Sequence, residues 1–414
     1  MREAGGDATY CEMNDQAAGG NDGAAEELSV RIAASVGAFT RAEWDSFEGT
    51  SKATAASAYN PFISYDFLTA LEDSGCAAPR SGWRGHHLRL EDGAGRLLGA
   101  LPCYLKSHSQ GEYVFDHGWA DAYERAGGRY YPKLQASVPF TPVTGPRLLV
   151  AQGREPLAVR LGLASALRQV TDKLGVSSAH VTFSTDADAD ALGAAGFLQR
   201  IDQQFHFVNE GYASYDDFLA TLASRKRKAL KKERREALAA GISIEWLTGK
   251  DLTERAWDDF FAFYMDTGSR KWGRPYLNRT FFSLIGERMA EDVLLVMAKR
   301  KGRYIAGAIN FIGSDALYGR NWGCIEDHPF LHFEVCYHQA IDFAIDRKLR
   351  IVEAGAQGEH KLARGYRPVT THSAHYIAHA GLRRAIDDYL ERERREVRHN
   401  VEYYEEHTPF RKGE

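Results

Sequence analysis

One pattern of hydrophobic and polar positions occurs twice along the chain. Pro61-Phe-Ile-Ser-Tyr-Asp-Phe-Leu-Thr69 and Pro275-Tyr-Leu-Asn-Arg-Thr-Phe-Phe-Ser283 have their aromatic and polar positions in step. Proline suits the first turn of a helix, because the N–H that it lacks would have no intrahelical partner there. Each segment therefore predicts the start of a helix.

Alternating apolar residues follow both segments. They lie at 87–90 and 96–104 in the first half, and at 293–298 and 303–311 in the second. A glycine-containing turn separates the runs of each pair, which is the usual signal of a β-hairpin. A further strand is expected at Tyr113-Val-Phe115 and at Ala316-Leu-Tyr318, each ending near a tryptophan, Trp119 or Trp322.

Helical spacing of apolar residues then predicts helices at 163–174 and 335–345, followed by strands at 179–183 and 351–352. The repeated order of elements predicts an α/β fold of two similar domains with mixed sheets, residues 28–210 and 211–385. Residues 1–27 lack an apolar core and are predicted to be a disordered tail. Residues 386–414 are predicted to be a C-terminal amphipathic helix and tail, docked on a domain through Ile386, Leu390, Val397 and Val401.

Composition narrows the class of protein. With 414 residues, 44% of them hydrophobic and 26% charged, the chain suits a soluble protein of two domains. No apolar run approaches the length of a membrane span. The five widely spaced cysteines, without Cys-x-x-Cys, argue for reduced thiols in the cytoplasm and against a metal site or a disulfide framework. The net charge of −4 gives no indication of a partner.

Eight cations stand in eleven positions between 225 and 235. An apolar stripe at Phe218, Leu222, Leu230 and Leu238 makes this an amphipathic helix with a cationic outer face. Such faces are usually just solvated, but the uncompensated charge also suits a phosphate-rich ligand, either a nucleotide diphosphate or the acceptor stem of an RNA. Without an RNA-binding motif, tRNA is the less favoured partner, and DNA is not expected. The candidate phosphate-binding residues are Arg225, Arg227 and Lys228.

Polar side chains among aromatic ones suggest a pocket in the second half. Tyr318, Arg320 and Trp322 alternate along a predicted strand and are expected on one face of the sheet, as substrate-binding residues. His332 and Glu334, at the start of the next helix, are expected to line a cleft. Glu334, His338 and Asp342 are four residues apart, and a mutually pairing polar face is favoured over a metal site.

The loop 266–276, which precedes a predicted helix, is cationic and aromatic and contributes Trp272 as a further candidate for substrate binding. Backbone N–H groups at the start of that helix could hold an anion. A helix-entry loop pinned by its aromatic residues explains this segment equally well.

The segment 353–366 carries the densest chemistry in the chain. It holds two carboxylates, an imidazole, a lysine and an arginine among glycines that let the backbone approach a ligand. A solvated loop is the alternative. Mixed acid, base and cation suit a reaction site, with Glu353, His360 and Lys361 as catalytic candidates. Gln357, Glu359 and Arg364 are the candidates for substrate binding.

These residues carry a resemblance over positions 28–385. The duplicated unit and the basic helix resemble the FemAB-like branch of the GNAT acyltransferase superfamily, within the bacterial group labelled as peptidoglycan biosynthesis or recognition proteins. The most specific motifs are Trp119-Ala-Asp-Ala-Tyr123, Tyr130-Tyr-Pro-Lys-Leu134, Pro139-Phe-Thr-Pro-Val143, Leu331-His-Phe-Glu-Val-Cys-Tyr337 and the segment 353–365.

The resemblance implies two tandem GNAT-like domains and transfer of an acyl group to an amine. In related Fem enzymes the donor is aminoacyl-tRNA, the acceptor is a peptidoglycan precursor, and a lysine in a Lys-x-x-x-Gly pattern is associated with the reacting ester. Lys361 and Gly365 fit that spacing. The turns at 151–156 and 327–332 lack the glycine pattern that cradles coenzyme A, and the long helical arm of some Fem enzymes is not evident.

These departures leave the acyl donor open between aminoacyl-tRNA and acyl-CoA, and no cofactor is assigned. In the favoured mechanism Lys361 stabilises the oxyanion or a phosphate, Glu353 or His360 accepts the proton of the amine, and Arg320, Trp322 and Glu334 hold a small-molecule or cell-wall-precursor acceptor. Two alternatives remain: an acetyl-CoA-dependent N-acetyltransferase with an atypical coenzyme site, and a non-catalytic protein that binds a cell-wall precursor.

Overall fold

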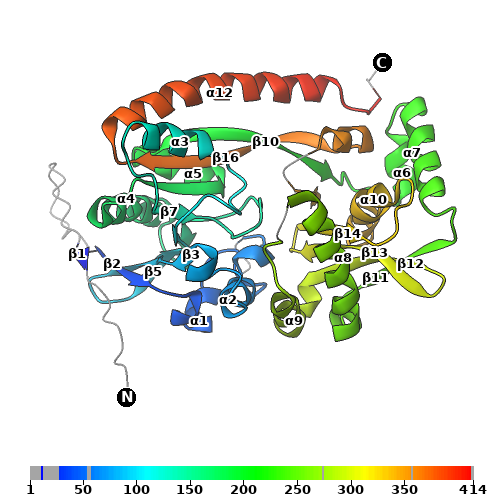
Figure 1. Cartoon of the computed structure of the whole chain (residues 1–414), viewed down its shortest axis with the longest axis horizontal. Coiled ribbons are helices and arrows are strands. Elements are labelled where there is room, and N and C mark those ends of the chain that lie inside the picture. The colour runs from blue at the N-terminus through cyan, green and yellow to red at the C-terminus, as the bar shows by residue number, and fades with distance from the viewer. Residues whose placement is uncertain (1–10, 13–27, 54–56, 273–274, 356–357, 412–414) are drawn as a thin grey trace.

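The computed structural model describes residues 11–12, 28–53, 57–272, 275–355 and 358–411. Its main feature is one large mixed sheet that runs through both halves of the chain (Figure 1). In order across the sheet, its strands are β11 (Ile242–Leu247), β12 (Val293–Arg300), β13 (Arg303–Ile312), β14 (Ala316–Cys324), β15 (Ile351–Glu353), β10 (Leu198–Val208), β16 (Arg367–Ile377), β9 (Ser178–Ser184), β7 (Lys133–Ala136), β6 (Tyr104–Lys106) and β3 (Trp83–Gly85).

A smaller sheet completes the first half. Its strands, in order, are β1 (Cys11–Glu12), β2 (Leu28–Ala33), β4 (His87–Asp92), β5 (Leu97–Leu101) and β8 (Leu149–Val150). The predicted hairpin is confirmed as the antiparallel pair of β4 and β5. Helix α4 (Pro156–Leu174) packs on these strands through Val159, Leu163 and Leu167, and its first residue is a proline, as the favoured first-turn position allows.

In the second half, β12, β13 and β14 form an antiparallel meander, and β15 lies parallel to β14. Strand β12 is buried on both faces, so it is an almost continuous apolar run. Val293, Leu295 and Met297 belong to the core with helices α8 (Glu254–Trp272) and α9 (Arg279–Arg288). Leu294 and Val296 belong to the opposite core, with the π-helix η6 (Glu334–His338) and α11 (Gln339–Asp346).

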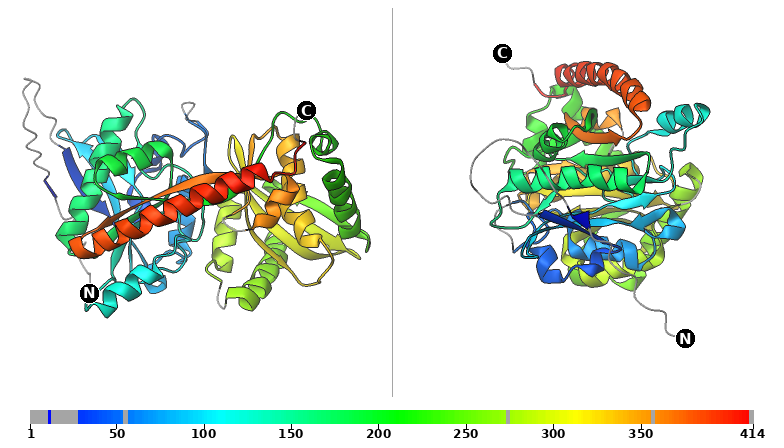
Figure 2. Two further views of the ribbon diagram at one scale, coloured as in Figure 1. Left: turned by 90° about the horizontal axis from the view of Figure 1, so that it is seen from above. Right: turned by 90° about the vertical axis from the view of Figure 1, so that its left-hand side faces the viewer.

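Strands β10 and β16 join the two halves. β10 pairs with β15 on one side and with β16 on the other, and β16 pairs in turn with β9. Helix α12 (Ala380–Glu406) crosses from the first half to the second over β10 and β16 (Figures 1 and 2). It buries Ile386 and Leu390, so the predicted docking of the C-terminal helix is confirmed. None of the described helices is both long and apolar enough to cross a membrane.

The remaining described α-helices are short and lie mostly in the first half. They are α1 (Arg41–Asp45), α2 (Tyr65–Asp73), α3 (His117–Arg125), α5 (Asp186–Ala194), α6 (Tyr215–Ala220), α7 (Ser224–Ala237) and α10 (Leu331–Phe333).

The strand predicted at 113–115 is wrong. Tyr113 has φ 62°, in the left-handed region that a strand does not allow. The buried ammonium of Lys133 donates to Glu112 and to Asp116 on either side of this turn, which fixes it as a loop. Trp119 accordingly lies in α3 and not at the end of a strand.

Two helix boundaries also differ from prediction. The amphipathic helix predicted from Phe218 to Leu238 is divided between α6 and α7, because Leu222 leaves the helix to form a β-bridge with Phe410, and the basic residues 225–235 all lie in α7. Helix α8 continues through Trp272, where a loop was expected from residue 266.

Candidate functional site

Lys361 is buried in the segment between β15 and β16. It lies in the 3-10 helix η7 (Glu359–Arg364), its exposed fraction is 1%, and its Nζ donates to the carbonyl oxygen of Gly355 at 2.7 Å. The pKa of Lys361 is lowered from 10.5 to about 7, first by burial and then by the charge of Arg320, while Glu353 partly opposes both effects. The amine therefore changes its charge near neutral pH.

Arg320 and Glu353 form a buried ion pair beside this lysine. Arg320 Nη2 lies 2.6 Å from Glu353 Oε1, and the exposed fractions of the two side chains are 5% and 3%. The parallel pairing of β14 with β15 sets this contact, since it places Tyr318 directly opposite Glu353. The guanidinium lies over the rings of Phe62, at 4.7 Å, and Tyr318, at 5.6 Å. The pair is thus held between two halves of the molecule.

His206 is a member of this group that the sequence analysis missed. It is directly opposite Glu353 in the antiparallel pair of β10 and β15, and its Nε2 is 3.3 Å from Oε1 of Gln204. Burial lowers the pKa of His206. The negative charge of Glu353 opposes this lowering, and the positive charges of Lys361 and Arg320 increase it. The available signal was the alternation of polar Gln204 and His206 with buried phenylalanines in a segment that was not predicted to be a strand.

Trp322 is not part of this group. The register of β13 and β14 shifts between the pairs Ala308 with Trp322 and Asn310 with Gly319, so β14 carries one extra residue. A bulge of this kind reverses the alternation of side chains. Trp322 therefore packs on the other face, 5.1 Å from the ring of His332, and the prediction of one common face with Tyr318 and Arg320 is wrong.

A second buried polar cluster ties the basic helix α7 to the Lys361 segment. Glu233 of α7 accepts two hydrogen bonds from Arg364, at 2.9 and 2.7 Å, and lies 2.8 Å from Nε2 of His338. The other ring nitrogen of His338 is 2.5 Å from the hydroxyl of Tyr215. Arg364 also lies over the ring of Phe333, at 3.5 Å. These contacts fix the position of η7 relative to α7.

Glu334 makes its contacts within the protein. It is fully buried, pairs with both Nε and Nη2 of Arg234, and accepts a hydrogen bond from Gln339. Asp342 also accepts a hydrogen bond from Arg234, at 2.6 Å, so the polar helical face pairs with α7.

His360 contacts a different set of residues from Glu353 and Lys361. Its Nε2 is 2.9 Å from the hydroxyl of Tyr337, and its ring centroid is 5.5 Å from that of Phe333 and 6.3 Å from that of His332. Burial lowers the pKa of His360, and the neighbouring cations Arg364 and Lys361 lower it further. The structure thus groups Glu353, Lys361 and Arg320, and gathers His360, His332 and Trp322 elsewhere.

The other residues predicted for the site come from several parts of the chain. Glu359 is exposed and accepts a hydrogen bond from Tyr404 of α12. Arg225 and Lys228 are exposed on α7 and Arg227 is half-buried there. Trp272 is the last residue of α8, and Gln357 lies outside the described residues. No group of His, Cys, Asp or Glu among the residues that the structure describes is arranged to hold a metal ion.

Solved structures of three other proteins are similar to this chain. The crystal structure of FemX is 12% identical, covers 84% of this chain and 98% of its own, and superposes with a TM-score of 0.53. A tandem GNAT protein from the clavulanic acid biosynthesis pathway is 14% identical over 85% of this chain and 99% of its own, with a TM-score of 0.45. L-PGS from Bacillus licheniformis is 8% identical over 80% and 92%, with a TM-score of 0.47.

A search of curated proteins gave no match. The likeness to FemX confirms the predicted fold of tandem GNAT-like units with mixed sheets. A family model described as peptidoglycan biosynthesis/recognition matches residues 35–412. The chain therefore belongs to the FemAB-like family.

Proposed function

We propose that this protein is an N-acyltransferase, which transfers an acyl or aminoacyl group from an ester or thioester to the amine of a peptidoglycan precursor. The observation that carries the proposal is Lys361, a fully buried lysine with a pKa near 7, held beside the Arg320–Glu353 ion pair. Burying an ionisable side chain is costly, and such groups cluster at functional sites. Membership of the FemAB-like family supports a role in peptidoglycan metabolism.

The chemistry explains why a lysine of this kind is useful. A neutral amine attacks the carbonyl carbon, a C–N bond forms, and the carbonyl oxygen becomes a tetrahedral oxyanion. The ammonium form of Lys361 stabilises that negative charge, and a pKa near 7 leaves this form well populated at neutral pH. Loss of one donor to an oxyanion costs about 3 kcal/mol in well-studied enzymes.

The attacking amine must also lose a proton. Glu353 is a candidate acceptor, and the neutral ring of His206 opposite it is a second. When the intermediate collapses, the C–O or C–S bond of the donor breaks and the leaving group takes a proton. A positioned base or acid typically contributes about 100- to 10,000-fold. Arg320 holds Glu353 in place for this role.

Helix α7 is the proposed contact for a phosphate-bearing donor. Its inner face is tied to η7 through Glu233 and Arg364, and its outer face exposes Arg225 and Lys228. A carrier bound along that face therefore lies close to the Lys361 segment. Aminoacyl-tRNA and acyl-CoA both carry phosphates, and a fall in donor affinity with rising salt is expected for either, steeper for tRNA.

In this proposal the reaction takes place in the cytoplasm, where thiols are reduced. Cys76 and Cys103, both in the described part of the chain, are buried free thiols.

The test is acyl transfer by the Lys361→Met variant. Purified protein is incubated with acyl-CoA or aminoacyl-tRNA and a peptidoglycan precursor, and the product is followed by mass spectrometry. The variant should lose about 100-fold or more in turnover, by the magnitude for an oxyanion donor. Lys250→Met, at an exposed lysine of the second half, is the matched control and should keep full activity. Undiminished transfer by folded Lys361→Met protein would refute the assignment.

A further inference from the structure

A cavity lies away from Lys361, between α2 and β3 of the first half and α8 and α9 of the second. Its volume is about 670 Å³, within the range of about 300–1,000 Å³ that is typical of small-molecule sites. The proposed mechanism uses none of its lining residues.

Apolar side chains make up most of its wall. They are Trp83, Phe140, Phe261, Met265, Tyr276 and Leu277. Phe140 and Tyr276 stack with ring centroids 5.0 Å apart and planes 16° from parallel, so one residue from each half forms a continuous aromatic surface. Met265 and Tyr276 keep exposed fractions of 38% and 41%, so both side chains are accessible to a ligand in the cavity.

The described residues that line the cavity carry positive charge and no negative charge. Of its described residues none is Asp or Glu, and Arg80 alone is charged at neutral pH, because burial lowers the pKa of His108. The guanidinium of Arg80 lies over Gly75, so closely that a Cβ there would be 2.0 Å from Nη2. Arg80, at the edge of an apolar cavity without a carboxylate among its described lining residues, is complementary to a ligand with one negative charge.

A second cavity, of about 10 Å³, adjoins this one beside Arg320. Leu277 lines both cavities, and the wall of the second includes Thr141, Phe281 and Arg320. Tyr113 is close enough to both Tyr276 and Arg320 for their charges to act on its pKa. Tyr113 and Phe140 both have positive φ, 62° and 64°, which is rare for large side chains. Strained residues of this kind tend to cluster at ligand sites.

We infer that the cavity binds an anionic amphiphile, an aliphatic or aromatic group that carries one carboxylate or phosphate. Its apolar part lies against Phe140, Tyr276 and Met265, and its anion pairs with Arg80. That this ligand is part of a substrate of Lys361 rests on the proposed function, whereas its binding does not.

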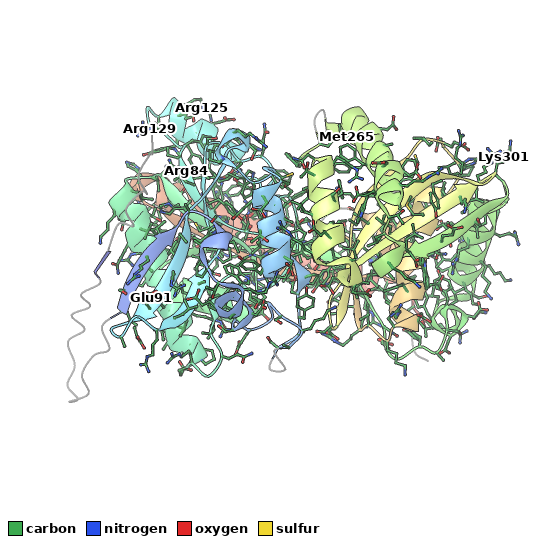
Figure 3. All side chains as sticks on the ribbon, turned by 90° about the horizontal axis from the view of Figure 1, so that it is seen from below. Arg84, Glu91, Arg125, Arg129, Met265 and Lys301 are labelled. Carbon is green, nitrogen blue, oxygen red and sulfur yellow. The ribbon has the colours of Figure 1, made fainter. Side chains whose placement is uncertain are left out.

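Calorimetric titration with decanoate and with decylammonium, each below its micelle concentration, tests the inference. The two probes share an alkyl chain and differ in the sign of their charge. Decanoate should bind at least about ten-fold more tightly, since hydrogen bonds to a charged group contribute about 1.5–3 kcal/mol. Arg80→Gln should remove about ten-fold of that affinity. Arg84→Gln, on the neighbouring strand β3 and outside the cavity, is the matched control and should change nothing (Figure 3).

A second variant distinguishes binding in this cavity from non-specific binding of the probes to the protein surface. Met265→Trp, at the labelled side chain of α8 in Figure 3, fills the cavity and should weaken both probes by about ten-fold, as expected for an occluded apolar contact. Circular dichroism confirms that each variant is folded. Absence of decanoate binding, equal affinity for the two probes, or full affinity of folded Met265→Trp protein overturns the inference.

Lys361→Met distinguishes this inference from the proposed function. It should bind decanoate as the natural protein does, because Lys361 does not line the cavity. If that variant binds decanoate and still transfers acyl groups, the proposed function fails and the binding site stands. If decanoate does not bind while Lys361→Met abolishes transfer, the binding site fails and the function stands.

Discussion

Replacing Lys361 with methionine should stabilise the protein while abolishing its activity. The side chain is 1% exposed, and its ammonium donates one hydrogen bond, to the carbonyl oxygen of Gly355. Methionine has a similar length and no charge, so it fills the same space without the desolvation cost. Functional sites commonly carry such a cost, and removing the functional group often raises stability.

The magnitude follows from the pKa of Lys361. In the unfolded chain the amine has a pKa of 10.5, and burial beside Arg320 lowers this to about 7 in the folded protein. Each pH unit of difference corresponds to about 1.4 kcal/mol, so protonated Lys361 lowers the free energy of unfolding by up to about 5 kcal/mol at pH 7 and below. Loss of the hydrogen bond to Gly355 returns about 1 kcal/mol. A gain of about 2–4 kcal/mol at pH 7 is expected for Lys361→Met.

The sign of the pH dependence makes the prediction specific. Between pH 7 and 10.5 the unfolded lysine holds a proton that the folded one has lost, so the stability of the natural protein rises with pH by about 1.4 kcal/mol per unit from this group. Below pH 7 both states are protonated and the cost is fully present. The advantage of Lys361→Met should therefore be largest at pH 6–7 and shrink steadily toward pH 10.

Urea denaturation at pH 6, 7, 8 and 9.5 measures this difference directly. Lys250→Met, at an exposed lysine, should show a small difference that does not change with pH. A Lys361→Met variant that is less stable at pH 7, or whose difference from the natural protein is constant between pH 7 and 9.5, would refute the buried, weakly basic lysine described above.

Two further predictions concern buried ion pairs. Arg320→Met leaves Glu353 buried without its cation and should lower the free energy of unfolding, measured by urea denaturation, by about 3–5 kcal/mol. The double variant Arg320→Met/Glu353→Gln should recover much of that loss. Additive effects of the two substitutions would contradict the pairing. Lys133→Met removes the nearest cation from Glu112 and Asp116 in the first half and should cost about 3–5 kcal/mol by the same measurement. A loss below about 1 kcal/mol would show that this network is not a charged one.

Local patterns predicted much of the secondary structure. Helix α4 and strands β12 and β13 follow the apolar spacing of their own residues, because each buries a face or both faces of a regular element. The loop at Tyr113 was predicted as a strand, because its conformation depends on Lys133, twenty residues away. The sequence near Tyr113 carries no signal of that partner.

Part of the candidate site was likewise predictable from the sequence, and part of it was not. Lys361 and Glu353 were identified from a glycine-rich segment dense in ionisable groups, and the structure brings them together with Arg320. His206 was missed, since it reaches the site only through the pairing of β10 with β15. Trp322 was assigned to the wrong face, because one extra residue in β14 reverses an alternation that looks regular in the sequence.

The sequence by itself determined the repeated α/β units, the amphipathic C-terminal helix and the chemistry of the 353–366 segment, since these depend on the types and spacing of neighbouring residues. Only the tertiary structure decided which charges meet, which face Trp322 takes, and that a cavity opens between the halves. The lowered pKa of Lys361 belongs to this second class, because desolvation and the field of Arg320 come from strands remote in the chain.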